Sequence, residues 1–308
     1  MVRVVVLGSS GFDLTIHLPR LPQRGETLLG ELHTGPGGKG ANQAVAARRA
    51  GAEVTFLTAF GDDTFGRQVS GHDRAEGIDL SYARVVSGAA NQVALIFVGS
   101  DGENLIGVAP GASARLGPDD IDRLPGSVFE PPAVFLTSLE VPLNTISRGL
   151  ERAKAAGLVT VLNPAPADRG ILNGAFLPHV DVLTPNQEEA RALTDLPADT
   201  PEQAERAANT LRGLGARHVI VTLGAAGCLV VSEREVKLVP SHRVSVVDTV
   251  GAGDAFNGAL AVALADGQPL VAAAAWACAA AAIAVTRPGA QGALAMREEI
   301  NVLARNGR

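Results

Sequence analysis

The sequence predicts an α/β protein built as a three-layer sandwich, in which a mainly parallel central sheet is covered by helices on both faces and a small β-sheet lid is added. Three observations lead to this class. Short β-rich runs are apolar on both faces, helical patterns separate these runs, and two further segments alternate apolar with polar residues instead. Strands that are apolar on both faces are typical of a parallel sheet covered on both sides.

Strands and helices are expected to alternate along most of the chain. The strands are expected at residues 2–8, 54–60, 133–139, 159–164, 180–185 and 218–224. The helices are expected at residues 39–50, 64–75, 143–156, 187–193, 201–214, 255–264 and 270–285. The last helix, LVAAAAWACAAAAIAV, is mostly alanine and shorter than the ~20 residues that a bilayer span needs, so we interpret it as a buried helix.

Two segments interrupt this alternation, at about 12–34 and 81–108. Their apolar and polar residues alternate, as expected for a sheet with one face in water. A small sheet over the carboxyl edge of the main one would explain them, and such a lid can exclude water from a reactive centre. No linker or repeat divides the chain, so residues 1–308 are expected to form a single domain.

Composition and charge exclude several classes of protein. The chain has 26 Lys and Arg against 32 Asp and Glu, a net charge of −6, which argues against nucleic acid or an anionic membrane as a partner. Hydrophobic residues make up 46% and charged residues 19% of the chain, which excludes a disordered protein. A globular protein is expected.

The cysteines and the amino terminus favour a cytoplasmic location. Cys228 and Cys278 lie far apart in sequence and form no C-x-x-C pair, so neither a disulfide framework nor a thiolate metal site is expected. The first eight residues, MVRVVVLG, are apolar but short and lack a cleavage site, so they favour a buried strand over a signal peptide.

Residues 35–40, GPGGKG, formally match the G-x-G-x-x-G pattern of dinucleotide-binding enzymes. That pattern should close the first βα unit of a chain, whereas here it follows the predicted lid hairpin. A Walker A loop is also disfavoured, because Gly40 stands where Ser or Thr should bind magnesium and His33 replaces the first Gly. The remaining alternative is a tight turn with no ligand.

Residues 248–254, DTVGAGD, are more specific. Gly251 and Gly253 remove side chains from a turn that leads directly into a helix, so successive N–H groups would converge on one point with the helix dipole behind them. This arrangement predicts an anion hole. Asp254 at its mouth is either the N-cap of its own helix or a base that accepts the proton of an attacking hydroxyl, kept ionised by local amides.

Two further turns are expected at the same edge of the sheet. Asn186 ends a predicted strand and Glu189 lies in the following first helical turn, where it either holds a magnesium-bound water or only interacts with the helix dipole. Residues 222–227, TLGAAG, form a strand-to-glycine turn that is either a cradle for a nucleotide phosphate or ribose, or an ordinary β-turn.

These segments together resemble the ribokinase-like (PfkB-type) carbohydrate kinases, and the resemblance covers nearly the whole chain. Its motifs in chain order are RGET at 24–27, PGGKGANQAVAA at 36–47, GDDTFG at 61–66, VALIFVGSDGENLIG at 93–107, SLE at 138–140, LNPAPA at 162–167, LTPNQEEA at 183–190, VTLGAAG at 221–227, DTVGAGDAFNGAL at 248–260 and AVTRPGAQ at 284–291. The resemblance implies ATP-dependent phosphorylation of the primary hydroxyl of a sugar, the 5-hydroxyl if the sugar is D-ribose.

The resemblance also implies roles for individual residues. Asp254 would be the catalytic base, and the amides of Gly251, Ala252, Gly253 and Asp254 would form the anion hole. The sugar-binding positions are Gly11, Asp13, Gly38, Lys39, Asn42, Glu140 and Asp254. The nucleotide positions are Asn186, Thr222, Gly224, Gly227, Gly253 and Cys278, and Glu189 completes an N-x-x-E magnesium motif. The potassium positions are Asp248, Val250, Ala284, Arg287, Gly289 and Ala293.

The sequence departs from the family pattern where the sugar would bind. The family has Asn, any residue, then Asp, whereas this chain has Gly11, Phe12 and Asp13, so an amide is missing and Phe12 is larger than expected. We therefore expect a smaller, drier or differently shaped pocket, which leaves another pentose, a fructose-type sugar or a nucleoside as alternative acceptors. Cys278 replaces a His near the nucleotide base and Ala293 lacks a hydroxyl, from which we expect small effects on nucleotide affinity or cation dependence.

Two readings outside the kinases are weighed against this one. An NAD(P)-dependent oxidoreductase rests only on the match at 35–40 and requires saturable NAD binding. A non-catalytic sugar sensor on the same fold requires loss of the base or the anion hole, yet Asp254, Gly251 and Gly253 are present. The family implies a homodimer paired through the lids, which exposed lid edge strands would permit.

Overall fold

The computed structural model describes residues 1–306 and contains three sheets. The largest has eight strands in the order β14(Val236–Val239)–β13(Cys228–Val231)–β12(His218–Thr222)–β11(Val182–Leu183)–β10(Val159–Asn163)–β9(Ala133–Ser138)–β1(Arg3–Leu7)–β4(Glu53–Leu57). The pairs from β12 to β4 are parallel, and β13 and β14 are antiparallel. The prediction of a mainly parallel central sheet is confirmed, and the antiparallel edge is an addition to it.

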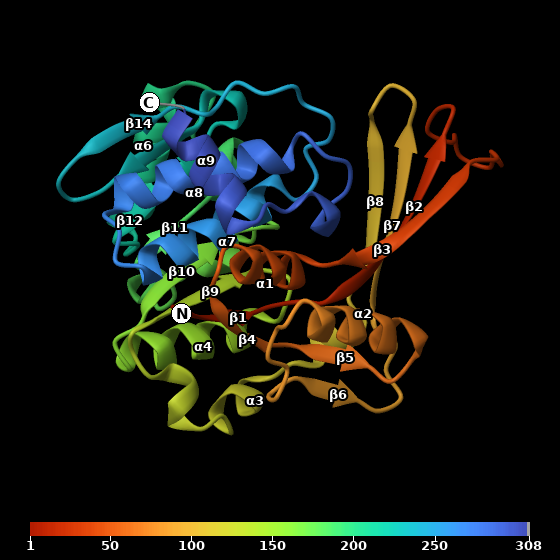
Figure 1. Ribbon diagram of the computed structural model, residues 1–308, viewed down its shortest axis with the longest axis horizontal. Coiled ribbons are helices and arrows are strands. Elements are labelled where there is room, and N and C mark those ends of the chain that lie inside the picture. The colour runs from red at the N-terminus through yellow and green to blue at the C-terminus, as the bar shows by residue number, and fades with distance from the viewer. Residues whose placement is uncertain (307–308) are drawn as a thin grey trace.

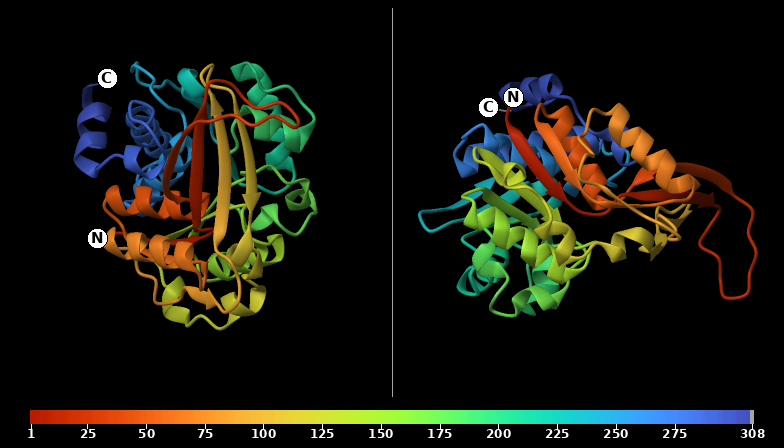
Figure 2. Two further views of the ribbon diagram at one scale, coloured as in Figure 1. Left: turned by 90° about the vertical axis from the view of Figure 1, so that its right-hand side faces the viewer. Right: turned by 90° about the horizontal axis from the view of Figure 1, so that it is seen from below.

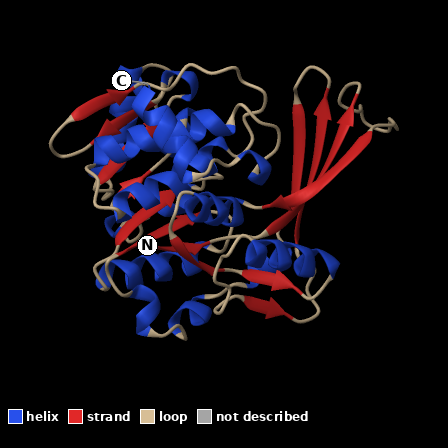
Figure 3. Cartoon of the chain, in the orientation of Figure 1, coloured by secondary structure: helices blue, strands red, loops and turns tan. Residues whose placement is uncertain are grey.

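Helices cover both faces of this sheet, as Figures 1 and 3 show. The helices are α1(Lys39–Arg49), α2(Thr64–Ala75), α3(Pro118–Asp122), α4(Leu143–Ala155), α5(Gln187–Thr194), α6(Pro201–Gly213), α7(Ala252–Ala265), α8(Leu270–Ala284) and α9(Arg297–Asn306). One buried cluster joins α1, α7, α8 and α9 to one face of the sheet, and a second joins α4, α5 and α6 to the other. The alternation of Val4 and Val6 with Val5 and Leu7 on β1 shows why both faces need cover, since each pair enters a different cluster.

A second sheet of four strands projects from one side of this body (Figure 1; Figure 2, right). Its order is β3(Glu31–Gly37)–β2(Gly11–Leu18)–β7(Gln92–Gly99)–β8(Asn104–Ala109), and we call it the second sheet. Strands β2 and β7 are parallel neighbours, and β3 and β8 flank them in antiparallel orientation. Two separate lengths of chain therefore meet side by side, as the two segments of alternating polarity suggested.

Three predicted elements differ from the structure. A single strand at 54–60 is wrong, because the chain leaves the large sheet after β4, and β5(Ala59–Gly61) pairs with β6(Arg84–Val86) in a third, two-stranded sheet. The segment 81–108 is consequently divided, since only β7 and β8 belong to the second sheet. Helix α7 begins at Ala252 and not at 255, which places Gly253 and Asp254 inside its first turn.

Helices α1 and α7 pack so closely that a side chain is excluded between them. A Cβ atom added to Gly258 of α7 would lie 2.5 Å from the Cβ of Ala46 and 2.8 Å from the backbone N of Ala47, both on α1. This contact fixes the two helices side by side in the cluster beneath one face of the sheet. Within residues 1–306, no helix has the length and apolar character that crossing a bilayer requires.

The packing of α1 on α7 predicts opposite effects for two Gly-to-Ala substitutions within helices. Gly258→Ala should lower the free energy of unfolding by about 1–3 kcal/mol, because the added methyl group has no room. Gly71→Ala on α2, where an added Cβ meets no atom within 4 Å, should raise it by up to about 1 kcal/mol, since Ala is the better helix former. Urea unfolding of both variants measures the difference, and two changes of the same sign would contradict the packing.

Candidate active site

Asp254 lies where the first turns of α7 and α1 meet, and it is only 6% exposed. Its two carboxylate oxygens accept hydrogen bonds from side-chain amides of neighbouring residues on α1. Asn42 Nδ2 donates to Oδ2 at 2.9 Å, and Gln43 Nε2 donates to Oδ1 at 3.0 Å. The alternative of Asp254 as the N-cap of its helix is wrong, because Gly251 occupies the N-cap position.

Burial raises the pKa of Asp254 above its ordinary value, and this effect exceeds the opposing ones. The positive charge of Lys39 and the amides of Asn42 and Gln43 favour the carboxylate, whereas the negative charge of Glu140 adds to the rise. The expectation of an aspartate kept ionised by backbone amides is thus corrected, because its partners are side-chain amides on another helix. A carboxylate with a raised pKa is the better proton acceptor.

The start of α7 presents backbone N–H groups that no side chain of the described residues caps. Gly251 adopts the left-handed φ of 75°, which favours glycine, and it turns the chain into the helix. A Cβ atom at Gly253 would meet nothing within 4 Å, so open space lies directly over the backbone there. The Ala252 N–H donates to the Thr249 carbonyl at 3.3 Å. The N–H groups of Gly253 and Asp254, the positive end of the helix dipole and bare backbone together make a site suited to an anion.

Asp13, Lys39 and Glu140 come from three different elements and lie close together. Glu140, after β9, accepts a hydrogen bond from the backbone N of Lys39 at 2.8 Å and another from the Ser9 hydroxyl. A Cβ atom at Gly37 would lie 2.2 Å from Asp13 Oδ2, so Gly37 makes room for that carboxylate. Burial, reinforced by the charges of Glu140 and Asp254, raises the pKa of Asp13 to about 6, and Lys39 opposes the rise.

The glycine-rich segment 35–40 connects β3 to α1, with Gly38 as the N-cap of α1 at a left-handed φ of 87°. A Cβ atom at Gly40 would lie 2.6 Å from the backbone of Gly8 and Ser9, so this glycine allows α1 to pack against the end of β1. The segment therefore joins the second sheet to α1 and does not close the first βα unit, as a dinucleotide-binding turn would.

Gly11 and Phe12 occupy opposite faces of β2, because side chains alternate along a strand. The Phe12 ring stacks on Phe65 of α2 with ring centroids 4.7 Å apart. Phe12 is therefore directed away from the face that carries Asp13. The space beside Gly11 is taken by Gln92 of β7, a residue to which no role was assigned from the sequence.

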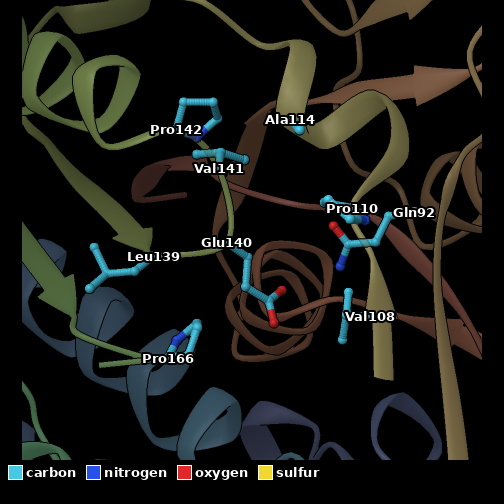
Figure 4. Close-up of a pocket in the computed structure, with 9 residues that line it drawn as sticks. All are labelled: Gln92, Val108, Pro110, Ala114, Leu139, Glu140, Val141, Pro142 and Pro166. Atoms are coloured by element: carbon cyan, nitrogen blue, oxygen red, sulfur yellow. The ribbon is translucent and has the colours of Figure 1, made fainter. Parts of the chain in front are cut away.

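A cavity of about 370 Å³ opens beside Glu140, between the base of the second sheet and the loops that follow β9 and β10 (Figure 4). We call it the Glu140 cavity. It is lined by Gln92, Val108, Pro110, Ala114, Leu139, Glu140, Val141, Pro142 and Pro166. In Figure 4 the side chains of Glu140 and Gln92 reach into it from opposite sides, and the other lining side chains are mostly apolar.

A larger cavity, of about 520 Å³, lies against the first turn of α7, and we call it the Cys278 cavity. Five of the six predicted nucleotide residues line it, namely Thr222, Gly224, Gly227, Gly253 and Cys278. Asn186 is not in the lining, but it forms an isolated β-bridge with Thr222. Sequence reasoning missed one wall, made by Ser241, His242, Arg243, Val244 and Val246.

The two cysteines, distant in sequence, are in contact in the structure. Cys278 of α8 and Cys228 of β13 are both buried and free, with their sulfur atoms 3.7 Å apart. The hydrogen bond from Cys278 and burial raise the pKa of the Cys228 thiol. A thiol with a raised pKa is a poor nucleophile and a poor metal ligand at neutral pH, and this applies to Cys228.

Asn186 and Glu189 form a reciprocal capping box at the start of α5. The Asn186 side chain accepts from the Glu189 backbone N at 2.8 Å, and the Glu189 carboxylate accepts from the Asn186 backbone N at 2.8 Å. Burial raises the pKa of Glu189 above its ordinary value. The hydrogen bond from the Asn186 backbone and the charge of nearby Lys39 oppose this rise but do not cancel it. The described residues contain no group of three or more His, Cys, Asp or Glu side chains placed to bind a metal ion directly.

Asp248 connects the loop before α7 to the loop after α8. Its Oδ1 accepts from the Val250 backbone N at 2.9 Å, and its Oδ2 accepts from the Gly289 backbone N at 2.8 Å. Three of the six predicted potassium positions are joined by these bonds. The Arg287 side chain pairs instead with Glu299 of α9, and Ala293 is fully buried.

Known proteins are similar to this chain over nearly its whole length. Residues 1–296 match the model of the pfkB family carbohydrate kinases. The ribokinase of Haemophilus influenzae is 36% identical, with 96% of each chain covered, and the deoxyribokinase of Salmonella typhi is 37% identical, with 97% of each covered. The structure of Arabidopsis thaliana ribokinase complexed with ribose and ATP superposes with a TM-score of 0.90 at 29% identity, covering 99% of both chains.

Burial and the negative charges near Asp13 predict that its ionised carboxylate lowers the free energy of unfolding. Because its pKa is raised from 3.8 to about 6, the native state holds the proton more tightly than the unfolded chain, and stability falls as pH rises between these values. Asp13→Asn removes this cost and should raise the free energy of unfolding at pH 8 by at most about 3 kcal/mol.

Urea unfolding at pH 8 and pH 4 checks this prediction, since the advantage of Asp13→Asn should shrink as pH falls from 6 to 4. Asp119→Asn, at an exposed position on α3, is the matched control. An equal stability difference at both pH values would refute the raised pKa.

Proposed function

This chain belongs to the pfkB family of carbohydrate kinases and is an ATP-dependent sugar kinase, and we propose that it phosphorylates the primary 5-hydroxyl of D-ribose. Relatives named ribokinase, one of them with ribose and ATP in its structure, support this acceptor. The observation that carries the proposal is the position of the α7 N-terminus. Gly253 lines the Cys278 cavity, whereas the adjacent Asp254 bonds to Asn42 on the side of Asp13, Lys39 and Glu140.

In this reaction Asp254 acts as the base. The sugar hydroxyl gives its proton to the Asp254 carboxylate, its oxygen forms a bond to the γ-phosphorus of ATP, and the bond from that phosphorus to the β,γ-bridging oxygen breaks to release ADP. The amides of Asn42 and Gln43 hold both carboxylate oxygens and leave lone pairs for the sugar hydroxyl. The carboxylate is therefore oriented before the sugar arrives.

The transferred phosphoryl group is proposed to lie over Gly251, Ala252, Gly253 and Asp254. Their N–H groups and the α7 dipole would stabilise its negative charge, and the bare Gly253 allows close approach. Lys39 supplies positive charge at this site. Despite the opposing effect of burial, its interactions with Asp254, Glu140, Glu189 and Asp13 raise its pKa and keep it protonated. Sugar hydroxyls are assigned to Asp13, Asn42 and Glu140, and the backbone of Gly38 and Lys39 borders the same space.

The nucleotide is assigned to the Cys278 cavity and the adjoining Asn186. A magnesium ion would arrive with ATP and neutralise phosphate charge, and the carboxylate of Glu189, already held by the capping box, fits a role in binding one of its waters. A potassium ion would be held mainly by backbone carbonyls of the loops that Asp248 joins, which fits the apolar side chains at Val250, Ala284 and Ala293.

The second sheet is proposed to serve as a lid within one kinase domain and as the surface through which two copies pair. All six residues of β8 are exposed. Large apolar side chains among the exposed residues of the sheet include Leu32, Leu95, Leu105, Ile106 and Val108. An exposed edge strand with apolar side chains is suited to association with a second copy.

A panel of acceptors tests the substrate. ADP release with MgATP and potassium should be fastest with D-ribose, and 2-deoxy-D-ribose is the second candidate, because a relative is a deoxyribokinase and position 11 lacks the amide of the family pattern. Other pentoses, fructose and nucleosides complete the panel. Higher kcat/KM for another acceptor would overturn D-ribose, and no turnover with any sugar would favour a non-catalytic sensor.

Asp254→Asn tests the base. Turnover should fall by about 10²- to 10⁴-fold, because the proton acceptor is lost, while ATP affinity measured by calorimetry should remain near normal. Asp266→Asn, at the other end of α7, is the matched control and should retain turnover. Near-normal turnover by Asp254→Asn would exclude the assigned role.

A further inference from the structure

Gln92 stands at the start of β7, directly beside Gly11 of β2. The parallel register pairs Gln92 with Gly11 and Ala94 with Asp13. Because side chains alternate along both strands, Gln92 lies on the same face of the second sheet as Asp13. It is therefore a neighbour of the carboxylate assigned to the sugar.

The side chain of Gln92 occupies the space that a side chain at position 11 would need. A Cβ atom at Gly11 would lie 3.2 Å from Gln92 Cγ and 3.3 Å from Gln92 Nε2, closer than ordinary contacts. Gly11 lies within an extended strand, a conformation open to any residue, so the backbone does not require glycine there. Gly11 is thus explained by the need to accommodate Gln92.

Gln92 is also a buried polar group that lacks a full set of partners. The residue is 4% exposed, and its Oε1 has no hydrogen-bond partner among the described residues. A buried acceptor without a partner costs about 1–3 kcal/mol. Gln92 lines the Glu140 cavity, and Figure 4 shows its amide directed into that cavity toward the Glu140 carboxylate. A ligand hydroxyl in the cavity would meet the Gln92 amide through Nε2, and a half-turn of the amide would bring the buried Oε1 into the same position.

We propose that Gln92 binds a hydroxyl of the sugar and helps to determine which sugar is accepted. This inference rests on the proposed function, because it assigns a further contact in the same site. The amide can accept from a hydroxyl through Oε1 and donate to one through Nε2. The pocket therefore contains a side-chain amide although position 11 is glycine, because Gln92 of the neighbouring strand β7 supplies it. A side chain at position 11 would require the Gln92 side chain to shift from its present position.

Four variants test this assignment: Gln92→Ala, Gly11→Asn, the double variant Gly11→Asn with Gln92→Ala, and Gln68→Ala as a control at an exposed glutamine of α2. Gln92→Ala should raise the KM for the preferred sugar about tenfold or more and change the ratio of kcat/KM between D-ribose and 2-deoxy-D-ribose. The KM for ATP and the thermal stability should change little, which separates a sugar contact from a structural role.

Gly11→Asn alone should lower kcat/KM, because its side chain collides with Gln92, and the double variant should recover much of the loss. Such non-additivity is expected of residues that contact each other, and recovery in the double variant is the sign expected when their side chains compete for one space. Unchanged kcat/KM for every accepted sugar in Gln92→Ala would overturn the proposal, as would additive effects of the two substitutions.

Sugar binding measured by calorimetry separates this inference from the proposed function. If sugars bind the wild-type protein and none of them is phosphorylated, the kinase mechanism would be overturned, yet a weaker Kd in Gln92→Ala would still support the contact. Preference for a sugar other than D-ribose would overturn the acceptor only. An unchanged Kd for every sugar that binds would overturn the role of Gln92.

Discussion

The close packing of α1 against α7 is the constraint on which the site depends. Gly258 allows the backbones to approach, and one turn nearer the sheet edge the same approach brings Asn42 and Gln43 of α1 to the carboxylate of Asp254 on α7. Neither helix forms the site alone, since α7 contributes the carboxylate and its N–H groups, and α1 contributes the amides and Lys39. A small residue in a helix interior thus sets the position of groups about one turn away.

Negative charge is concentrated around a single lysine. Asp13, Glu140, Glu189 and Asp254 all interact with Lys39, and burial raises the pKa of three of these four acids. Such an arrangement is unfavourable for the empty fold. The sugar and nucleotide proposed to bind there would offset this cost, because hydrogen-bond donors and positive charge would then replace water. Stability and ligand affinity are therefore set against each other in these residues.

Much of the fold and part of the site follow from local sequence. Alternating strands and helices predicted the layered sheet, and the glycine turns at 222–227 and 251–253 were identified because turn, strand end and helix start are adjacent in the chain. Contacts between distant elements could not be predicted in this way. Gln43 and Gln92 have no characteristic spacing, and their roles follow from the approach of two helices and from the register between β2 and β7. The split of 54–60 depends on pairing with β6, about 25 residues later, which periodicity does not report.

One residue, Gly38, separates β3 of the second sheet from α1 of the body. Its left-handed φ of 87° turns the chain between them, and a Cβ atom there would lie 2.8 Å from the backbone N of Gly11. A connection of one residue leaves the sheet and the helix little freedom to move independently. Any tilt of the sheet must be absorbed by the torsion angles of Gly38 and its neighbours, and it acts directly on the Lys39 N–H that bonds to Glu140. The angle of the second sheet and the position of the first peptide group of α1 are therefore coupled, and a change in that angle would move the backbone that borders the Glu140 carboxylate.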